Sequence, residues 1–358
     1  MIWQIVQWGL VQLAAGKVSI IILNYNGRRN LAGVLKECLD SVMHTDYPDF
    51  EVLFVDNGST DDSVNFVCRE YGKDPRINIV KSERNFGYAE GNNVGLRKAD
   101  GAYFALLNND TKVDPRWLQV LVDAVESPKV GAAQSKIVRM DEPRILDCAG
   151  GLLDFYGYHF ERGRGESVYN YDNPGEIFYA KGASFLLKRE VLAEVGLFDS
   201  DIFLYFDEVD LCWRIWLSGH MVVYAPTSIV SHSSGKTASA LQQRQRMFFY
   251  VRNHFLVLLK NYSLANAFYA TIVSLLFEAR NFTLFLLRGK PLLALSIIRG
   301  IFWNLTHLNA TLRKRQVVQN QIRQVSDGDI KRHMLKPFPP FPLYILFSRS
   351  RYRRADPT

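Results

Sequence analysis

Short apolar runs recur through the first third of the chain, and each ends at polar or glycine-containing residues. They cover residues 18–23, 51–55, 77–81 and 103–107. Runs of this length, rich in β-branched residues and leucine, are typical of strands buried on both faces of a sheet. After each run, apolar residues or turn residues indicate a helix. The pattern therefore predicts an α/β fold with a doubly wound, mostly parallel sheet and helices on both faces.

The helices are predicted from spacing and from turn residues. We expect them at 30–44, between Ser59 and Tyr71, at 89–99, and from Asp114 onward, where Pro115 suits the first helical position. Residues 130–180 are irregular and rich in Gly and Tyr. Beyond them the pattern predicts strands at 185–187 and 222–224 and helices at 189–195 and 207–219.

Polar residues gather where the predicted strands end. Asn24, Asp56 and Asn108 follow a strand directly, Asn85 lies in the loop after the third strand, and Asp110 comes two residues after Asn108. In open α/β sheets, ligands bind at the carboxyl ends of the strands. Turn formation alone could explain any one of these loops. Asp56 and Asp110 together favour a binding site, with Asp110 as a handle for metal and phosphate.

Two further clusters carry titratable side chains. Asp207, Glu208 and Asp210 crowd the first turn of a predicted helix, where the helix dipole alone would explain one or two carboxylates. A half-enclosed carboxylate there could accept a proton from an attacking hydroxyl. His232 is either a structural hydrogen-bond donor or, with Asp110, a ligand for Mn²⁺ or Mg²⁺.

Several of these stretches resemble motifs of family 2 glycosyltransferases, and the rhamnosyltransferase-like members above all. The resemblance covers roughly residues 18–262. It rests on Val18–Gly27, Val55-Asp-Asn-Gly-Ser59, Asn85-Phe-Gly-Tyr88, Leu107-Asn-Asn-Asp110, Gly196-Leu-Phe-Asp199 and Phe206-Asp-Glu-Val-Asp-Leu-Cys-Trp-Arg214. It implies a GT-A fold and an inverting transfer from a nucleotide-diphosphate sugar, such as dTDP-rhamnose or a UDP-sugar. The acceptor would be a hydroxyl of a glycan or a lipid-linked glycan, as in polysaccharide biosynthesis.

The resemblance also implies roles for individual residues. Asp56 would contact the nucleoside, and Asn108 stands where the family has the first acid of its Asp-x-Asp motif. Glu208 matches the general base, with Asp207 as second choice. Asp110 and His232 would hold the divalent metal, Mn²⁺ or Mg²⁺. The residues expected to bind the nucleotide sugar are Asn26, Asp56, Asn57, Asn85, Gly87, Asn92, Asn108, Asp110 and Gly182. The Gln-x-x-Arg-Trp motif of processive enzymes is absent, so we expect single additions.

The C-terminal third is apolar and then basic. The apolar runs are 248–259, 264–287 and 291–308, with Glu278, Arg280 and Arg299 inside them. Soluble core, interfacial helices and membrane spans are all compatible with this pattern, and the flanking basic residues favour interfacial helices. The net charge of +7 is concentrated beyond Ala310. We therefore expect a cytoplasmic protein bound peripherally to the inner face of the cell membrane.

This gives a domain plan for the whole chain. Residues 1–16 form an amphipathic extension or a frayed end, 17–245 the catalytic domain (nucleotide-binding half 17–128, acceptor half 129–245), 246–312 the apolar helices, and 313–358 a basic tail. The four cysteines are widely spaced, which favours a reducing compartment over a disulfide framework or a zinc site.

Three other functions are alternatives to sugar transfer. A nicotinamide-dependent oxidoreductase is disfavoured because the first strand–helix turn lacks Gly-x-Gly-x-x-Gly. A non-catalytic sugar- or lipid-binding scaffold remains the alternative, and Asn108 in place of an acid is its best support. The basic tail would permit nucleic-acid binding, but no recognition motif accompanies it, so no nucleic acid is expected as a partner.

Overall fold

The computed structural model describes residues 16–31, 33–233 and 241–336. The expected N-terminal extension lies outside this part except for Gly16, as do the residues just after Ser233 and the end of the basic tail. The strands are β1 Val18–Asn24, β2 Phe50–Asp56, β3 Ile77–Lys81, β4 Tyr103–Asn108, β5 Thr111–Val113, β6 Val130–Arg139, β7 Leu146–Cys148, β8 Gly151–Leu153, β9 His159–Glu161, β10 Gly175–Glu176, β11 Ser184–Lys188 and β12 Met221–His232.

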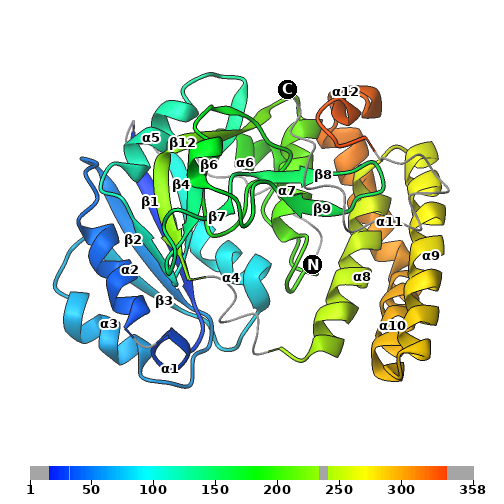
Figure 1. Ribbon diagram of the computed structural model, residues 1–358. Helices are drawn as coiled ribbons and strands as arrows, with labels where there is room; N and C mark the ends of the chain where they lie inside the picture. Colours follow the sequence, from blue (N-terminus) through cyan, green and yellow to red (C-terminus); the bar gives the residue numbers. More distant parts are fainter. Residues whose placement is uncertain (1–15, 32, 234–240, 337–358) are drawn as a thin grey trace.

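One large mixed sheet lies at the centre of the molecule (Figure 1). Its strand order is β10-β12-β6-β11-β4-β1-β2-β3, with β5 paired to β12 and β7 to β6. Strands β4, β1, β2 and β3 are parallel, so their carboxyl ends meet at one edge. Strand β11 runs antiparallel to both β4 and β6, and it joins this parallel half to the second parallel pair, β6 and β12.

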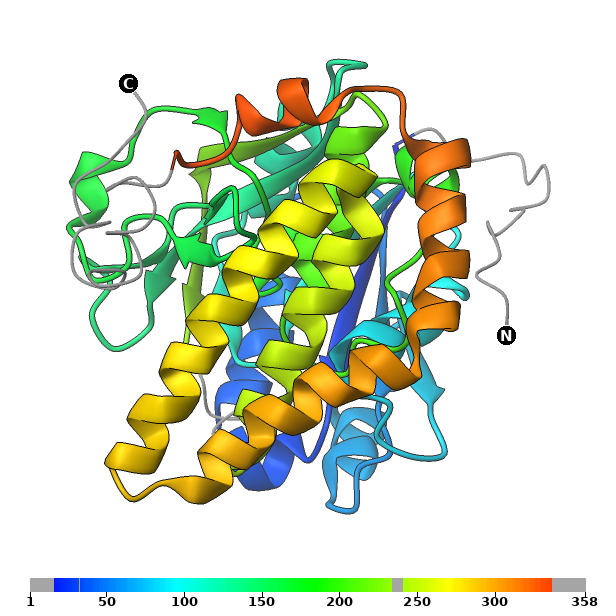
Figure 2. The same ribbon diagram turned by 90° about the vertical axis from the view of Figure 1, so that its right-hand side faces the viewer.

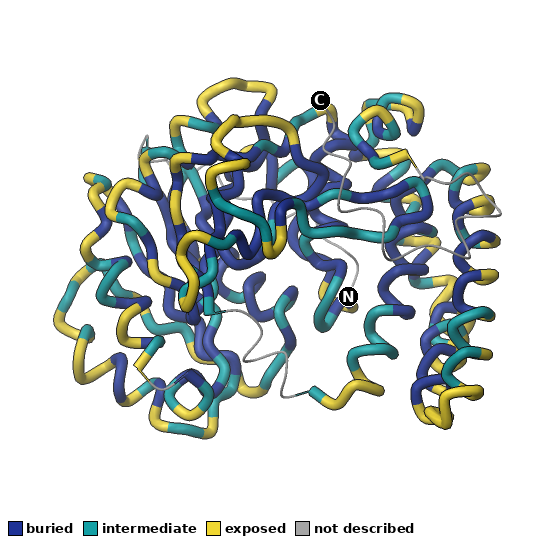
Figure 3. The backbone as a smooth tube through the Cα atoms, in the orientation of Figure 1, coloured by how far each residue is buried: buried dark blue, intermediate teal, exposed yellow. Residues whose placement is uncertain are grey.

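Helices cover both faces of the sheet, as predicted. They are α1 Gly27–Leu31, α2 Val34–Met43, α3 Ser63–Tyr71, α4 Gly87–Leu96, α5 Trp117–Ala124, α6 Arg189–Val195, α7 Asp207–Leu217, α8 Gln243–Asn261, α9 Leu264–Leu287, α10 Pro291–Thr306, α11 Leu308–Val317 and α12 Asp327–Lys331. Side chains alternate across β1, so Ile20 and Ile22 join the core beneath α2, α3 and α5, and Ile21 joins the core beneath α4, α6 and α7. Figure 3 shows the central strands buried along most of their length.

Four local predictions differ from the structure. The helix expected at 30–44 is divided into α1 and α2. The next difference is at α5, which begins at Trp117 rather than at Pro115, so the proline lies before the helix. Strand β6 occupies the start of a stretch predicted to be irregular. Strand β12 is much longer than 222–224 and ends at His232, which places the histidine at a strand terminus.

Helices α8, α9 and α10 pack side by side at one end of the molecule (Figures 1 and 2). By length and composition, α9 is the one helix in the described residues that is long and apolar enough to cross a membrane, and α10 is a shorter apolar helix. The basic tail was expected from residue 313 onward. Its first part, together with residues 308–312, folds as α11, a π-helical turn at Val318–Ile322, and α12.

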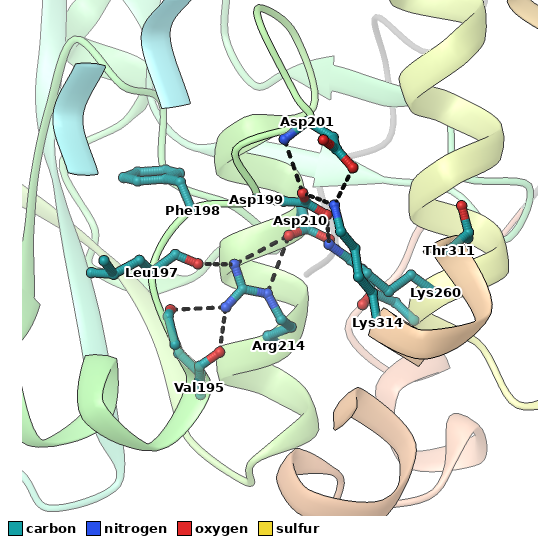
Figure 4. A network of polar contacts seen from close by, with 12 residues as sticks. Val195, Leu197, Phe198, Asp199, Asp201, Asp210, Arg214, Lys260, Thr311 and Lys314 are labelled. Atoms are coloured by element: carbon teal, nitrogen blue, oxygen red, sulfur yellow. Dashed lines mark hydrogen bonds and ion pairs between the residues drawn. The ribbon is translucent and has the colours of Figure 1, made fainter. Parts of the chain in front are cut away.

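Buried charges join these C-terminal helices to α7 (Figure 4). Lys260 of α8 lies 2.6 Å from Asp199 and 2.8 Å from Asp210, and all three side chains are fully buried. Lys314 of α11 also pairs with Asp199, and Arg214 pairs with Asp210 at 3.1 Å. Burial raises the pKa of Asp199, but the two lysines outweigh burial and hold that pKa well below its usual range. The network fixes α7 to the helices that follow it.

Candidate active site

The loop after β2 forms a closed polar turn beside the end of β1. Asn24 and Asp56 are register partners in the parallel sheet, and the Asn24 amide lies 3.4 Å from Asp56 Oδ1. The backbone N–H of Ser59 donates to Asp56 Oδ2 at 3.2 Å. Asn26 adopts a left-handed conformation with φ of 53°, and its side-chain oxygen accepts from the Thr60 N–H at 2.8 Å. These bonds hold the Asp56 carboxylate at the carboxyl edge of the sheet.

A second set of amides ties this turn to the start of α4. Asn57 Nδ2 donates to Asn85 Oδ1 and to the carbonyl of Gly87, both at 3.0 Å. Gly87 has a φ of +82°, and a Cβ there would lie 2.3 Å from the carbonyl oxygen of Phe203, so the close approach requires glycine. Asn92 is buried inside α4 and donates to the carbonyl of Tyr88, within the same helix.

Asp110 and His232 meet, although 122 positions separate them in the chain. Asp110 Oδ1 lies 3.2 Å from His232 Nε2, and both side chains are about 6% exposed. Strand β5 brings them together, because its pairing with β12 places Thr111 opposite His232. The Asn108 amide lies 3.5 Å from the same ring nitrogen.

The other ring nitrogen of His232 is held by a residue that the sequence pattern did not single out. Asp147 Oδ2, on β7, lies 2.8 Å from His232 Nδ1 and 2.8 Å from the ammonium of Lys181. Burial lowers the pKa of His232, but its bonds to Asp110 and Asp147 outweigh burial and raise it to about 9. Burial likewise raises the pKa of Asp147, whereas His232 and Lys181 hold it well below its usual range. Asp147 therefore remains ionised.

A cavity of about 390 Å³ opens beside this cluster. His232 and Asp147 line it together with a second acid, Asp141, and two guanidinium groups, those of Arg139 and Arg164. Arg164 pairs with Glu161. Arg139 also pairs with Asp141, at 2.8 Å. The cavity thus offers several donors for an anionic group next to His232.

The acid pair, Asp207 and Glu208, lies at the start of α7, and the two side chains have different environments. Glu208 is half-buried, and its Oε1 accepts from the backbone N–H of Gly182 at 2.9 Å. Asp207 is 2% exposed, and its Oδ1 accepts from the Glu208 N–H at 3.2 Å. Its Oδ2 has no hydrogen-bond partner among the residues that the structure describes. Burial, and then the charge of Glu208, raise the pKa of Asp207 well above its ordinary value. Glu208 is consequently the more accessible of the two carboxylates.

The backbone before the acid pair is strained. Tyr205 and Phe206 both have left-handed backbone angles, with φ of 67° and 68°. Bulky residues rarely adopt this conformation, and it costs roughly 1 to 3 kcal/mol each. Side-chain amide bonds hold it, since Asn253 Nδ2 donates to the carbonyls of Leu204 and Tyr205 at 2.8 and 2.9 Å. The strain turns the chain sharply into α7 and aims the first-turn carboxylates.

Segment 181–183 joins all of these groups into one site. Lys181 reaches Asp147, which holds His232. Gly182 donates to Glu208, and its carbonyl accepts from the Tyr88 hydroxyl at 2.9 Å, next to Gly87. The Ala183 carbonyl accepts from the Asn108 N–H at 3.1 Å. The loops that carry Asp56, Asp110, Glu208 and His232 are thereby tied together at one edge of the sheet.

Sequence reasoning missed Asp147, Lys181 and Glu161, which pairs with Lys181 at 2.8 Å. Asp147 and Glu161 lie in the stretch whose spacing predicted no regular structure. A signal did exist, because Asp147 is an isolated acid between the apolar residues Leu146 and Cys148. Its side-chain contact with His232, at the end of β12, is a tertiary contact that no local pattern reports.

Residues 19–196 match the family model described as "Glycosyl transferase family 2", and the chain belongs to that family. It is 32% identical over 244 residues to the O-antigen biosynthesis protein RfbC of Myxococcus xanthus, a match that covers 63% of this chain and 18% of that protein. It is 26% identical over 213 residues to the N-acetylglucosaminyl-diphospho-decaprenol L-rhamnosyltransferase of Mycobacterium tuberculosis, covering 52% and 68% of the two chains. The resemblance inferred from the motifs is confirmed.

The fold is also that of a solved transferase. The structure of GalNAc-T7 with UDP, GalNAc and Mn²⁺ matches with a TM-score of 0.52 and 19% identity, over 60% of this chain and 43% of that one. A likeness at this identity shows the fold, and the expected GT-A architecture is confirmed. The chain spans about a fifth of the length of the Myxococcus relative.

Within the described residues, no group of three or more His, Cys, Asp or Glu side chains is arranged to hold a metal ion. The candidate metal ligands are therefore the pair Asp110 and His232, and any further ligands would come from the substrate and from water.

Proposed function

We propose that the chain transfers one sugar from a nucleotide-diphosphate donor, of the dTDP-rhamnose or UDP-sugar kind, to an acceptor hydroxyl with inversion at the anomeric carbon. The observation that carries this proposal is the convergence on segment 181–183. It links a nucleoside-side carboxylate (Asp56), a carboxylate–imidazole pair (Asp110 and His232) and an accessible acid (Glu208). A donor needs the first two and an acceptor needs the third.

The nucleoside and the diphosphate of the donor would be bound by different loops. Asp56 is held where its carboxylate can accept hydrogen bonds from a base or a ribose. Asn26, Asn57, Asn85 and Gly87 shape the walls around it. The cavity beside His232, with its two guanidinium groups, suits the charge of a diphosphate.

Asp110 and His232 fit a divalent ion of the Mn²⁺ or Mg²⁺ kind. Two ligands at adjacent corners of an octahedron, each about 2.1 Å from the ion, lie about 3 Å apart, and the two atoms here are 3.2 Å apart. A carboxylate on the far nitrogen of a ligating histidine, as Asp147 is, orients the ring and strengthens its basicity. When bound, such an ion supplies positive charge for the leaving diphosphate.

The acid pair supplies the proton chemistry. Glu208 accepts the proton of the attacking hydroxyl as the new bond between that oxygen and the anomeric carbon forms. The bond from the same carbon to the diphosphate breaks on the opposite face, and one displacement inverts the carbon. The Gly182 N–H holds Glu208 in one orientation, while Asp207 stays buried behind it. Asn92 and Asn108 would support the donor side.

The acceptor we propose is a glycan or a lipid-linked glycan, met at the inner face of the cell membrane. The Mycobacterium relative is an N-acetylglucosaminyl-diphospho-decaprenol L-rhamnosyltransferase, and its lipid-linked acceptor supports this class. The length of α9 and its apolar character give the location further support.

Replacing Asp110 with Ala is expected to abolish the metal-dependent part of donor affinity. The variant removes one of the two candidate ligands, and the imidazole alone is a weak site for such ions. Titration calorimetry with UDP-sugars or dTDP-rhamnose, with and without Mn²⁺, measures the effect. Asp114→Ala is the matched control, because Asp114 lies on the next turn and only accepts from the Arg116 N–H. Unchanged Mn²⁺-dependent affinity in Asp110→Ala would refute the metal role.

Replacing Asp147 with Asn is expected to weaken Mn²⁺ binding about 10- to 100-fold, the usual effect of removing a supporting partner of a metal ligand. The amide can still accept from the ring N–H, so the change removes charge and little else. Calorimetry with Mn²⁺ alone measures it without any turnover. Asp172→Asn serves as control, since Asp172 pairs with Lys136 and is largely exposed. Equal Mn²⁺ affinity in both variants would remove Asp147 from the site.

A screen of nucleotide sugars for hydrolysis and transfer tests the function as a whole. We expect metal-dependent release of a nucleoside diphosphate from at least one donor. Donor binding without any release, under conditions where the protein is folded, would favour the non-catalytic scaffold that Asn108 suggested.

A further inference from the structure

The outer side of α9 and α10 is a continuous apolar surface. Exposed large apolar side chains recur every three or four residues along α10 and along α9 from Leu264 to Leu276, which is the spacing of one helical stripe, and they appear again at the end of α9. We call this the hairpin face. Prominent members, each between 46% and 78% exposed, are Leu264, Phe268, Leu276, Leu287, Leu292 and Phe302. A surface of this extent marks an interaction site on a water-soluble fold.

The opposite side of α9 is already occupied. Phe277 is 4% exposed and its ring packs edge-on against Tyr158, with centroids 5.4 Å apart. Ser274 and Glu278 on the same side are buried. Because Ser274, Phe277 and Glu278 are buried against the rest of the fold, lipid could not surround this part of α9. The geometry suits a helix that lies along a surface with one face in contact.

The charges around the hairpin face have one sign. Between Leu264 and Arg313 the chain has a single acidic residue, Glu278, and that residue is 2% exposed. Basic side chains are exposed at the tip, where Arg288 and Lys290 connect the two helices. Arg299 is exposed on α10 as well. The face therefore combines apolar area with positive charge and presents no carboxylate to solvent.

We propose that the hairpin face docks on a lipid bilayer that carries anionic headgroups. The apolar stripe would lie at the boundary between headgroups and acyl chains, and Arg288 and Lys290 would contact the headgroups. A second copy of the chain would bring the same positive tips toward the same face without any carboxylate to pair them. The charge pattern therefore selects a bilayer over a dimer.

Ring contacts lead from this face to the acid pair. Tyr158, which packs on Phe277, also lies 4.5 Å from the His254 ring. His254 stacks on Phe206, at 5.5 Å, and Phe206 precedes Asp207. These contacts join the proposed docking face to the residues that carry the acid pair. In this respect the inference rests on the proposed function, because a lipid-linked acceptor held at the bilayer would then lie close to Asp207 and Glu208.

Vesicle sedimentation of the full chain, without donor or acceptor, tests the inference. Vesicles of phosphatidylcholine with phosphatidylglycerol are expected to bind the protein, and vesicles of phosphatidylcholine alone more weakly. The double variant Leu287→Glu, Leu292→Glu should lower affinity at least about tenfold, since each leucine loses its favourable transfer from water. Tyr169→Glu is the control, because Tyr169 is 69% exposed on a different part of the molecule.

The charge contribution is tested separately. Arg288→Gln with Lys290→Gln should weaken binding to the anionic vesicles by about fivefold per residue, since each basic side chain near such a surface contributes about 1 kcal/mol. Binding to neutral vesicles should not change. Lys73→Gln with Lys98→Gln is the matched control, because both lysines are exposed far along the chain from the hairpin.

Two results with the leucine variant overturn the inference. One is equal vesicle binding by the leucine variant and the native chain. The other is a dimer, seen by light scattering without lipid, that the leucine variant dissociates. Transfer to a soluble acceptor is measured beside both. If the native chain transfers sugar to that acceptor but does not bind the anionic vesicles, the docking surface alone is overturned. If the native chain binds the vesicles but transfers sugar from no donor, the proposed function alone is overturned.

Discussion

Replacing Glu208 with Gln is expected to lower the rate of sugar transfer by about 10²- to 10⁴-fold, the usual contribution of a general base. The amide cannot accept the proton of the attacking hydroxyl. Its oxygen can still accept from the Gly182 N–H, which lies 2.9 Å from Glu208 Oε1 in the native chain. The shape of the site should therefore persist, and donor affinity by calorimetry should stay native while turnover is lost.

The matched control is Asp207→Asn. Asp207 is buried, and burial together with the charge of Glu208 raises its pKa well above its ordinary value. The protonated form thus favoured has the same shape as the amide. We expect a much smaller loss of transfer than for Glu208→Gln. The reverse order, with Asp207→Asn inactive and Glu208→Gln active, would assign the base to Asp207.

Replacing Lys260 with Met is expected to lower the free energy of unfolding by about 3 to 5 kcal/mol, the cost of leaving buried charges without their partner. Lys260 is fully buried between Asp199 and Asp210. The value should lie near the lower end, because Asp199 keeps Lys314 and Asp210 keeps Arg214. Urea unfolding followed by circular dichroism measures the change.

Lys314→Met provides the comparison for that measurement. Its side chain is 14% exposed, and its second partner, Asp201, is 45% exposed, so solvent screens part of the interaction. A smaller loss of stability is expected than for Lys260→Met. Equal losses from the two variants would mean that burial of the network is not what makes it stabilising.

The parallel half of the sheet could be predicted almost residue for residue. Strands β1, β2 and β4 are buried on both faces, so their sequences are short apolar runs that end where the chain leaves the core. The expectation of burial on both faces is wrong for β3, which is an edge strand with no fully buried residue. Strand β6 could not be predicted in this way, because it buries Gln134, Ser135 and Lys136. Ser135 bonds to Ser184 and Ser228, both at 2.9 Å. The Ser135 hydroxyl of β6 thus finds its hydrogen-bond partners on residues far away in the chain, which a local sequence pattern does not report.

The same distinction, between local sequence pattern and contacts with distant residues, applies to the candidate site. Asp56 and Asp110 follow predicted strands, and the acid pair begins a predicted helix, so position in the pattern was enough to select them. Asp147 was missed because its importance depends on contacts with His232 and Lys181 from other strands and loops. The roles of all these residues remain predictions until variants are measured.

The buried network has a consequence for modularity. The family match ends at residue 196, just before Asp199. The counter-charges of Asp199 come from α8 and α11, and Asp210 takes one of its two from α8. A fragment cut after β12 would keep both carboxylates and lose both lysines. Moving this unit to another scaffold would thus require α8 and α11 as well, so the folding unit is longer than the segment that matches the family model.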